Sequence, residues 1–351
     1  MTTLQKMAAA VKQLRQTYIP KAKARRFYLG VEQFSLSEFS SLNAAGRRLG
    51  LNRWTGENRI RRAVTDTSLA DHLQRLLVSE AVASHTGQWY CSLDHSQFGP
   101  FCIAILAVSY RKGRAIPTWC QVNISEAGLI APLLTALEEL FVFLGEHAPG
   151  LQVVLVMDRW FASDKLFTLF TRYGVYFIAR TKSDKLVQLP WDPSWWREPI
   201  HDISHPELPI TYRSHRLRLV RSDYQEEMKD PEPWFLLTNL PENITRRIVL
   251  NRYAERFEIE EAFKDIKWLQ RLEWQRVRKP EVIRSLLLFV FLGWWLLWRY
   301  TSKDIPKQTQ KVHPKKQLSW FKQAWEYLQR LLRTPLLPPI PVTQLQIGGK
   351  K

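Results

Sequence analysis

The run LQVVLVMD, residues 151–158, decides the fold class of this chain. It is apolar from Val153 to Met157 and ends on a carboxylate, Asp158. A continuous apolar run of this length is typical of a strand that helices bury on both faces. Three more predicted elements flank it: helices at 126–147 and 163–173, and a second apolar strand at 174–180. The order of strand, helix and strand predicts an α/β fold.

The residues before this run predict an antiparallel meander. From residue 88 the pattern changes to period two and apolar runs, which indicates strands at 89–98, 101–110 and 116–122. The segment RKGRA, residues 111–115, contains a glycine and indicates the hairpin turn between the last two strands. We expect the first strand to lie at the centre of the sheet, next to the strand that ends at Asp158.

Composition divides the rest of the chain. Residues 1–85 are basic and helical in pattern, whereas 181–234 is rich in Pro, Trp and alternating strands. The last segment is rich in Lys, Gln and Pro around one short amphipathic helix near 318–332. We therefore expect four parts: an all-α N-terminal domain over 1–85, an α/β core over 86–180 and 235–300, a β-rich insertion over 181–234, and a basic C-terminal tail over 301–351.

The positive charge is concentrated at the two ends of the chain. The 351 residues include 51 Lys and Arg against 33 Asp and Glu, a formal net charge of +18. Residues 1–62 hold 13 basic and 3 acidic residues and 301–351 hold 10 and 2, which leaves 28 against 28 between them. A neutral body with basic ends suits nucleic acid held by flanking segments, although basic ends also bind anionic lipid or aid solubility.

The stretch SLNAAGRRLGLNRWTGENRIRRAVTD, residues 41–66, has the rhythm of a helix–turn–helix. A first helix would carry Leu42, Ala45 and Leu49, and a turn would follow at 50–52. A basic second helix of this kind enters the major groove in proteins that bind DNA, although a plain helical bundle has the same pattern. The candidate DNA-binding residues are Arg53, Arg59, Arg61 and Arg62.

Disulfide scaffolds, zinc sites and membrane spans are disfavoured. The three cysteines, Cys91, Cys102 and Cys120, are odd in number and lack metal-ligand spacing. The run LLLFVFLGWWLLW, residues 286–298, has 13 residues where a span needs about 20, so we expect a buried helix. The start MTTLQKMAAAVKQL lacks the apolar core of a signal peptide, so we expect a cytoplasmic protein without a membrane partner.

Two carboxylates interrupt apolar strands. Asp94 lies within the strand at 89–98, and Asp158 ends the strand at 151–158. A buried carboxylate is unfavourable unless it is paired or binds a metal. Neighbouring strands would place both side chains at the sheet edge where α/β folds bind ligands. Because oxygen donors without His or Cys suit Mg²⁺ or Mn²⁺, the pair predicts a divalent metal site.

The stretch NRYAERFEIEEAFKDIKWLQ, residues 251–270, supplies a third carboxylate. As one continuous helix, at about 100° per residue, it places Tyr253, Arg256, Glu260 and Lys267 in one polar strip about 60° wide. The apolar face opposite would carry Ile259, Ala262, Ile266 and Leu269. Among Glu255, Glu258, Glu260 and Glu261, Glu260 alone lies inside the strip. Carboxylates beside Arg and Lys suit a site that holds metal and phosphate together, although a solvated amphipathic helix has the same composition.

These residues resemble a known enzyme family. The triad Asp94, Asp158 and Glu260 resembles the DDE triad of bacterial insertion-sequence transposases. The spacing Tyr, two residues, Arg, three residues, Glu, six residues, Lys is the signature of the insertion-sequence-four group, and residues 253–267 match it without departure. Asp158, Arg159 and the aromatics that follow are similar to the group's Asp-Arg-Gly-aromatic pattern, with Trp160 in place of Gly.

The resemblance implies an RNase H-like core with a mixed five-stranded sheet flanked by helices, and a DNA transposase that cleaves and joins strands at the ends of an insertion sequence. It implies a two-metal site for Mg²⁺ or Mn²⁺ on the triad. Contacts to DNA phosphate would come from Tyr253, Arg256, Lys267 and Arg159. Base stacking on a flipped nucleotide would involve Trp191, Trp195 or Trp196, which equally suit the core of the insertion.

The resemblance also implies partners and a location. Both the element ends and the target are double-stranded DNA, and holding two ends together implies a dimer on DNA, associated with the nucleoid. Two alternatives stay open: a catalytically silent DNA-binding protein derived from a transposase, and another RNase H-like metal-dependent nuclease. For His95, next to Asp94, we expect a supporting or packing role.

Overall fold

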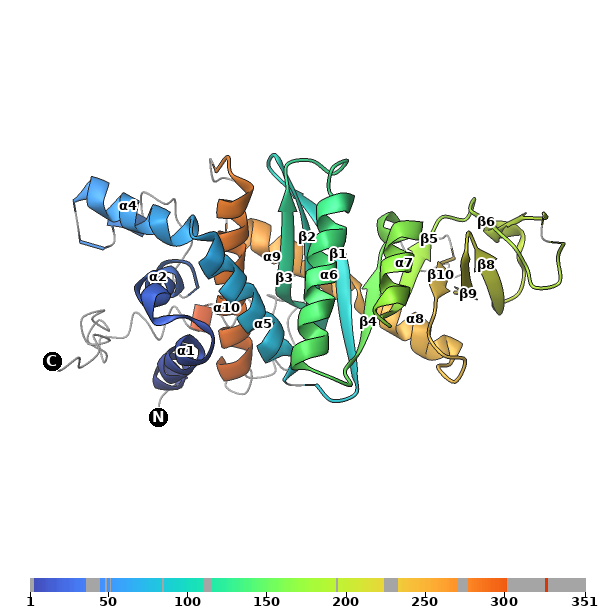
Figure 1. Ribbon diagram of the computed structural model, residues 1–351, viewed down its shortest axis with the longest axis horizontal. Helices are drawn as coiled ribbons and strands as arrows, with labels where there is room; N and C mark the ends of the chain where they lie inside the picture. Colours follow the sequence, from blue (N-terminus) through green and yellow to red (C-terminus); the bar gives the residue numbers. More distant parts are fainter. Residues whose placement is uncertain are drawn as a thin grey trace, which may run out of the picture.

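The apolar runs form the centre of one large mixed sheet (Figure 1). The computed structural model describes residues 3–35, 45–47, 49–50, 52–83, 85–109, 115–193, 195–223, 233–270, 277–301 and 326–327. The strand order is β3-β2-β1-β4-β5-β10-β9-β8. In that order the strands are Ala115–Asn123, Phe101–Ser109, Gln88–Phe98, Gln152–Met157, Tyr176–Thr181, Phe235–Thr238, His215–Arg221 and Glu207–Tyr212.

The pairing at the centre confirms the expected neighbours. β1, β2 and β3 form an antiparallel meander, and β1 pairs in parallel with β4, with Leu93 opposite Met157. β4 pairs in parallel with β5. The segment 111–114, where the hairpin turn was expected, lies outside the described residues.

The five expected strands form β3-β2-β1-β4-β5, and three more strands extend the sheet to eight within the described chain. β8 and β9 come from the segment that was expected to form a separate insertion, and β10 joins them to β5 by antiparallel pairing. A separate two-stranded sheet, β6 (Leu186–Val187) and β7 (Glu198–Pro199), adds to this region. The division into four parts therefore stays a prediction.

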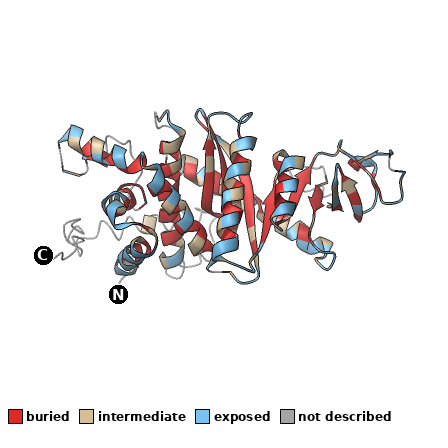
Figure 2. Ribbon diagram, viewed as in Figure 1, coloured by how far each residue is buried: buried red, intermediate tan, exposed pale blue. Residues whose placement is uncertain are grey.

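Period-two alternation assigns each side chain of a strand to one face of the sheet. On β1, Trp89, Cys91 and Leu93 pack into the core beneath α6 (Ile130–His147) and α7 (Asp164–Arg172). Tyr90, Ser92 and Asp94 therefore face the other side, which α8 (Arg246–Glu255) and α9 (Phe257–Gln270) cover. Figure 2 shows the two layers as buried strands between helices with exposed outer faces.

An N-terminal helical region packs beside the sheet around α10 (Pro280–Thr301) (Figure 1). Its elements are α1 (Thr3–Tyr18), η1 (Lys21–Lys23), α2 (Ala24–Gly30), η2 (Val31–Ser35), α4 (Arg53–Val64) and α5 (Thr67–Val82). α10 lies between these helices and β3, and its side chains share one core cluster with both.

The apolar run near the end of the core is longer than the sequence indicated. α10 has 22 residues rather than 13, since Pro280 begins it and Glu281 follows in its first turn. Among the helices described, α10 is long and apolar enough to cross a membrane by length and composition. Its most apolar 18-residue segment is 83% buried inside the protein. This burial is that of a core helix, as expected. The predicted C-terminal helix near 318–332 lies outside the described residues except for 326–327, which are helical.

Candidate active site

Asp94 and Asp158 lie side by side at one end of the central strands. The paired residues Leu93 and Met157 come directly before them on β1 and β4. Even-numbered side chains of β4, Val154 and Val156, face the α8 side of the sheet, so the alternation places Asp158 on the same side as Asp94. Asp94 is buried, 7% exposed, and accepts a hydrogen bond from the His95 backbone N–H at 2.8 Å.

A short 3₁₀ turn directly follows Asp158 at the end of β4. In the turn η3 (Arg159–Phe161), the Phe161 N–H donates to the Asp158 carbonyl at 3.0 Å. The Phe161 ring is fully buried. Trp160, which stands where the resembling family has Gly, packs on the His95 ring with centroids 4.5 Å apart. His95 therefore has the packing contact that we expected.

The third carboxylate comes from a helix that breaks. α8 ends at Glu255 and α9 begins at Phe257, with Arg256 between them in a turn. The prediction of one continuous helix is therefore wrong at this one residue. Tyr253 is fully buried and Arg256 is 3% exposed, so neither faces solvent in a polar strip. The apolar side is confirmed for Ile259, Ala262 and Ile266, which are buried; the side chain of Leu269 lies outside the described part of the chain.

Arg256, the residue between the two helices, lies between two carboxylates. Its NH1 donates to Asp94 Oδ2 at 2.6 Å and its NH2 donates to Glu260 Oε1 at 2.8 Å. The side chain of Arg256 is 4% exposed, that of Asp94 10% and that of Glu260 44%. The guanidinium thus joins the centre of the sheet to the first turns of α9.

One cleft of about 330 Å³ brings the predicted triad together. Its walls carry all three carboxylates, Asp94, Asp158 and Glu260, together with His95, Ser96, Arg256, Phe263, Lys264 and Lys267. The other three glutamates of the stretch have different partners: Glu255 pairs with Arg252, Glu258 with Ser109 and Glu261 with Lys264. Glu260 is therefore the carboxylate of this stretch that reaches the cleft.

Burial sets the electrostatics of the cleft. Desolvation raises the pKa of Asp94 to about 6, against the opposing effect of the Arg256 guanidinium. Desolvation also raises the pKa of the Tyr253 phenol to about 12. Burial opposes the charge of Arg256, but Tyr253, Asp94, Asp158 and Glu260 together raise its pKa. The cleft is therefore a site where carboxylates need a cation close by.

The three carboxylates suit a divalent metal by their chemistry. Their donors are all oxygen, and the most buried of them, Asp94, is costly to charge without a cation. Within the described residues, no group of three or more His, Cys, Asp or Glu side chains lies close enough to hold an ion as they stand. In this arrangement the guanidinium of Arg256 contacts both Asp94 and Glu260.

One basic residue near the cleft was missed in the sequence. Arg180 is 8% exposed and follows Ala179, which pairs with Met157 across β4 and β5. It therefore lies at the same sheet edge as Asp158, one strand further along, and both side chains affect the pKa of Tyr253. A charge at the end of the predicted strand GVYFIAR was the available signal.

The other predicted residues lie away from the cleft walls. Arg159 is exposed, as are Arg59, Arg61 and Arg62 on α4, while the side chain of Arg53 lies outside the described part of the chain. Three tryptophans are exposed rather than buried in the insertion core: Trp191 at 62%, Trp195 at 76% and Trp196 at 46%. The alternative that these side chains build that core is therefore wrong.

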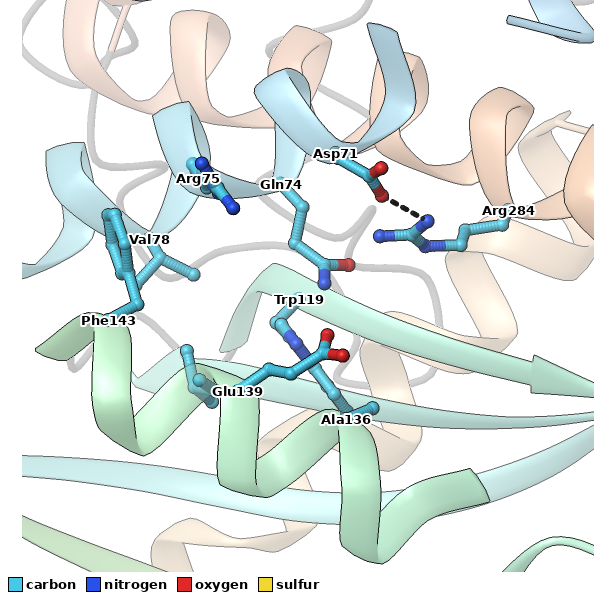
Figure 3. A pocket seen from close by; sticks show the side chains of 10 residues that line it. Asp71, Gln74, Arg75, Val78, Trp119, Ala136, Glu139, Phe143 and Arg284 are labelled. Atoms are coloured by element: carbon cyan, nitrogen blue, oxygen red, sulfur yellow. Dashed lines mark hydrogen bonds and ion pairs between the residues drawn. The ribbon is translucent and has the colours of Figure 1, made fainter. Parts of the chain in front are cut away.

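A second cavity of similar size has a different composition (Figure 3). It measures about 320 Å³ and lies between α5, α6, β3 and α10. Asp71 and Arg284 form an ion pair at 2.7 Å on one wall, with Gln74 beside Asp71 on α5 and Trp119 and Glu139 across from them. None of the three predicted catalytic carboxylates lines this cavity.

Comparison with known proteins identifies the family. The model of the transposase DDE domain matches residues 112–296, which is 185 of the 351 residues. The match includes Asp158 and Glu260 and begins after Asp94. No curated protein matches the chain. The chain belongs to the family of transposase DDE domain proteins.

Proposed function

We propose that this protein is a DNA transposase of the insertion-sequence-four type, with an RNase H-like core that cleaves and joins DNA strands at the ends of its element. The family implies a DNA transposase function, and DDE transposases generally use divalent metals. The observation that supports the insertion-sequence-four assignment is the cleft. Carboxylates from β1, from the residue directly after β4 and from α9 line it, at the end of two parallel strands.

In this proposal Asp94, Asp158 and Glu260 hold two divalent ions, Mg²⁺ or Mn²⁺. Bound ions of this kind activate the attacking water or 3′ hydroxyl and stabilise the departing oxygen. The chain itself positions the phosphate: Lys267 lines the cleft, and the exposed Arg159 lies on the turn directly after Asp158. Tyr253 and Arg256 would join them as phosphate contacts once the cleft opens.

DNA outside the cleft would meet two further surfaces. The exposed arginines of α4 suit the phosphates of a duplex, and α4 would be the second helix of a helix–turn–helix. Trp191, Trp195 and Trp196 expose flat aromatic faces that stack on unpaired bases. Two chains would pair on DNA to hold both ends of the element, in the cytoplasm at the nucleoid.

The test is cleavage of a duplex that carries the terminal repeats flanking the coding sequence, with Mg²⁺ or Mn²⁺. We expect Asp94→Ala, Asp158→Ala and Glu260→Gln each to abolish cleavage and to leave end binding measurable. Normal cutting by Asp158→Ala would show that the metal assignment is wrong. A wild-type protein that binds the ends and never cuts them would be the catalytically silent alternative.

A further inference from the structure

Arg256 occupies the space between two of the proposed metal ligands. A single guanidinium donates to Asp94 Oδ2 at 2.6 Å and to Glu260 Oε1 at 2.8 Å. The two carboxylates come from different elements, a central strand and a helix that crosses it. The contact therefore sets the distance between the two ligands.

The surroundings of Arg256 hold the side chain in this place. The guanidinium lies over the Phe257 ring, 4.8 Å from its centroid, and 5.6 Å from that of Tyr253. Its Nε is buried without a hydrogen-bond partner among the described residues, so the hydrogen bonds of the guanidinium to the carboxylates come from NH1 and NH2. Arg256 lies in the turn between α8 and α9 and lines the cleft together with Glu260 and Lys267.

We infer that Arg256 is a positioning residue that holds Asp94 and Glu260 together in the metal-free protein, and that a divalent ion must displace its guanidinium to bind there. The inference rests on the proposed metal-dependent function. A Mg²⁺ ion binds carboxylate oxygens at about 2.0–2.1 Å. Asp94 and Glu260 would be two of its ligands, and an ion between them would stand close to the guanidinium, so the two cations would repel each other.

Displacement links metal binding to DNA binding. A guanidinium released from both carboxylates loses two charge-assisted hydrogen bonds. A phosphate oxygen at the metal would replace them, because Arg binds phosphate with the same two-pronged geometry. Metal binding and phosphate binding therefore each strengthen the other, and the metal binds weakly when no phosphate is in the cleft.

The test measures Mn²⁺ binding by calorimetry and electron paramagnetic resonance, with the full chain and no DNA. If the guanidinium of Arg256 is released from both carboxylates less than about one-tenth of the time, the apparent metal affinity falls about tenfold or more. We therefore expect Arg256→Ala to bind Mn²⁺ about tenfold more tightly than the wild type. Without metal it should melt at a lower temperature, and saturating Mn²⁺ should remove most of that difference.

Three further variants make the result specific. Arg256→Lys, which keeps the charge and the fold but reaches one carboxylate at a time, should bind Mn²⁺ with intermediate affinity. Arg252→Ala removes an arginine of α8 that pairs with Glu255 outside the cleft, and should bind as the wild type does. Asp158→Ala added to Arg256→Ala should lose the tight binding, which places the ion in the cleft.

The outcomes separate the inference from the proposed function. Weaker or unchanged Mn²⁺ binding in both Arg256 variants would overturn the inference and leave a metal-dependent transposase in place. Absence of Mn²⁺ binding from every variant, together with metal-independent cleavage, would overturn both.

Discussion

Asp94 is the residue whose charge depends most on what occupies the cleft. Its burial raises its pKa to about 6, against an ordinary value of 3.8. Between these two pH values the folded metal-free protein keeps a proton that the unfolded chain has lost. Its contribution to stability is therefore fully present below about pH 4 and is lost as the pH rises through about 6.

We expect the free energy of unfolding of the metal-free wild type to contain this pH-dependent step, and Asp94→Asn to lack it. The shift of about two pKa units corresponds to a difference of about 2 to 3 kcal/mol across the step. Urea unfolding in the presence of a chelator, at half-unit steps from pH 4 to 7, measures both proteins. The difference between the two curves reports Asp94 together with the groups that interact with it, such as Asp158; parallel curves would contradict the assignment.

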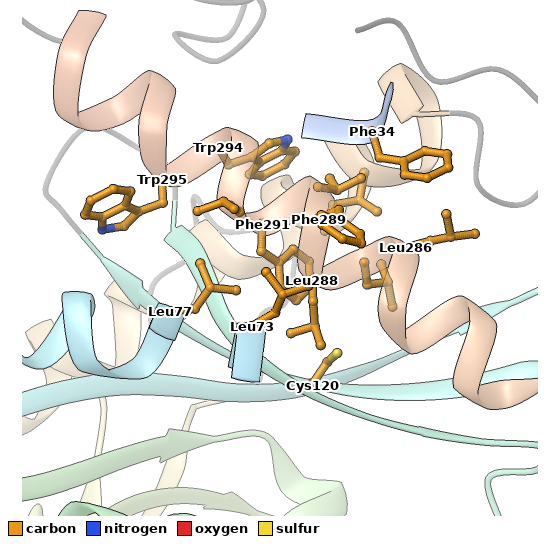
Figure 4. Close-up of a cluster of buried hydrophobic side chains, with 14 of the residues drawn as sticks. Phe34, Leu73, Leu77, Cys120, Leu286, Leu288, Phe289, Phe291, Trp294 and Trp295 are labelled. Carbon is orange, nitrogen blue, oxygen red and sulfur yellow. The ribbon is translucent and has the colours of Figure 1, made fainter. Parts of the chain in front are cut away.

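At the scale of elements, α10 depends on one close contact with the N-terminal region. Figure 4 shows its apolar side chains, among them Phe289 and Trp294, packed with Phe34 of η2 and Leu73 of α5. A Cβ added at Gly293 would lie 2.3 Å from the Ser35 carbonyl oxygen, which is backbone and cannot move aside alone. Gly293 is therefore a position where η2 and α10 approach closely.

We expect Gly293→Ala to lower the free energy of unfolding by about 1 to 3 kcal/mol, the usual cost of overpacking. Gly145→Ala is the matched control, because Gly145 is in α6 and a Cβ there meets no atom within 4 Å. The control should raise the stability by up to about 1 kcal/mol, since Ala is the better helix former. Both values follow from chemical denaturation, and equal effects of the two substitutions would contradict the close contact.

The elements also show how far the sequence predicts this structure. Strands such as 152–157 follow from apolar runs bounded by polar residues, and their pairing places Asp94 beside Asp158 without further information. The break at Arg256 was missed because no Gly or Pro marks it. The residue turns inward to pair with Asp94, 162 positions away, and local patterns do not include that contact. The continuation of the sheet through β10 was missed for the same reason. β10 has only four residues, which is too short for its sequence pattern to predict which strand it pairs with.

At the scale of the molecule, the proposed DNA contacts lie at both ends and the cleft lies between them. Figure 1 shows α4 at one end and β6 to β9 at the other, with β1, β4 and α9 in the middle. The basic residues of 1–62 give that segment a net charge of +10, whereas the residues from 63 to 300 are neutral. A duplex would therefore be drawn to the end that carries α4, and the cleft would act on the strand it reaches.

This distribution predicts which charges control the salt dependence of DNA binding. Reversing Arg59 and Arg62 on α4 should weaken duplex binding and reduce the slope of log K against log salt by about two, since each lost phosphate contact removes about 0.9. Reversing Lys165 and Arg172, which are exposed on α7 in the neutral body, changes the net charge equally and should leave the slope unchanged. Fluorescence anisotropy with one 30-bp duplex (a length chosen as about three turns of B-DNA) over a series of salt concentrations measures all three proteins. Equal slopes for the two variants would mean that total charge, rather than its position on α4, governs binding, and the helix–turn–helix proposal would then lose its support.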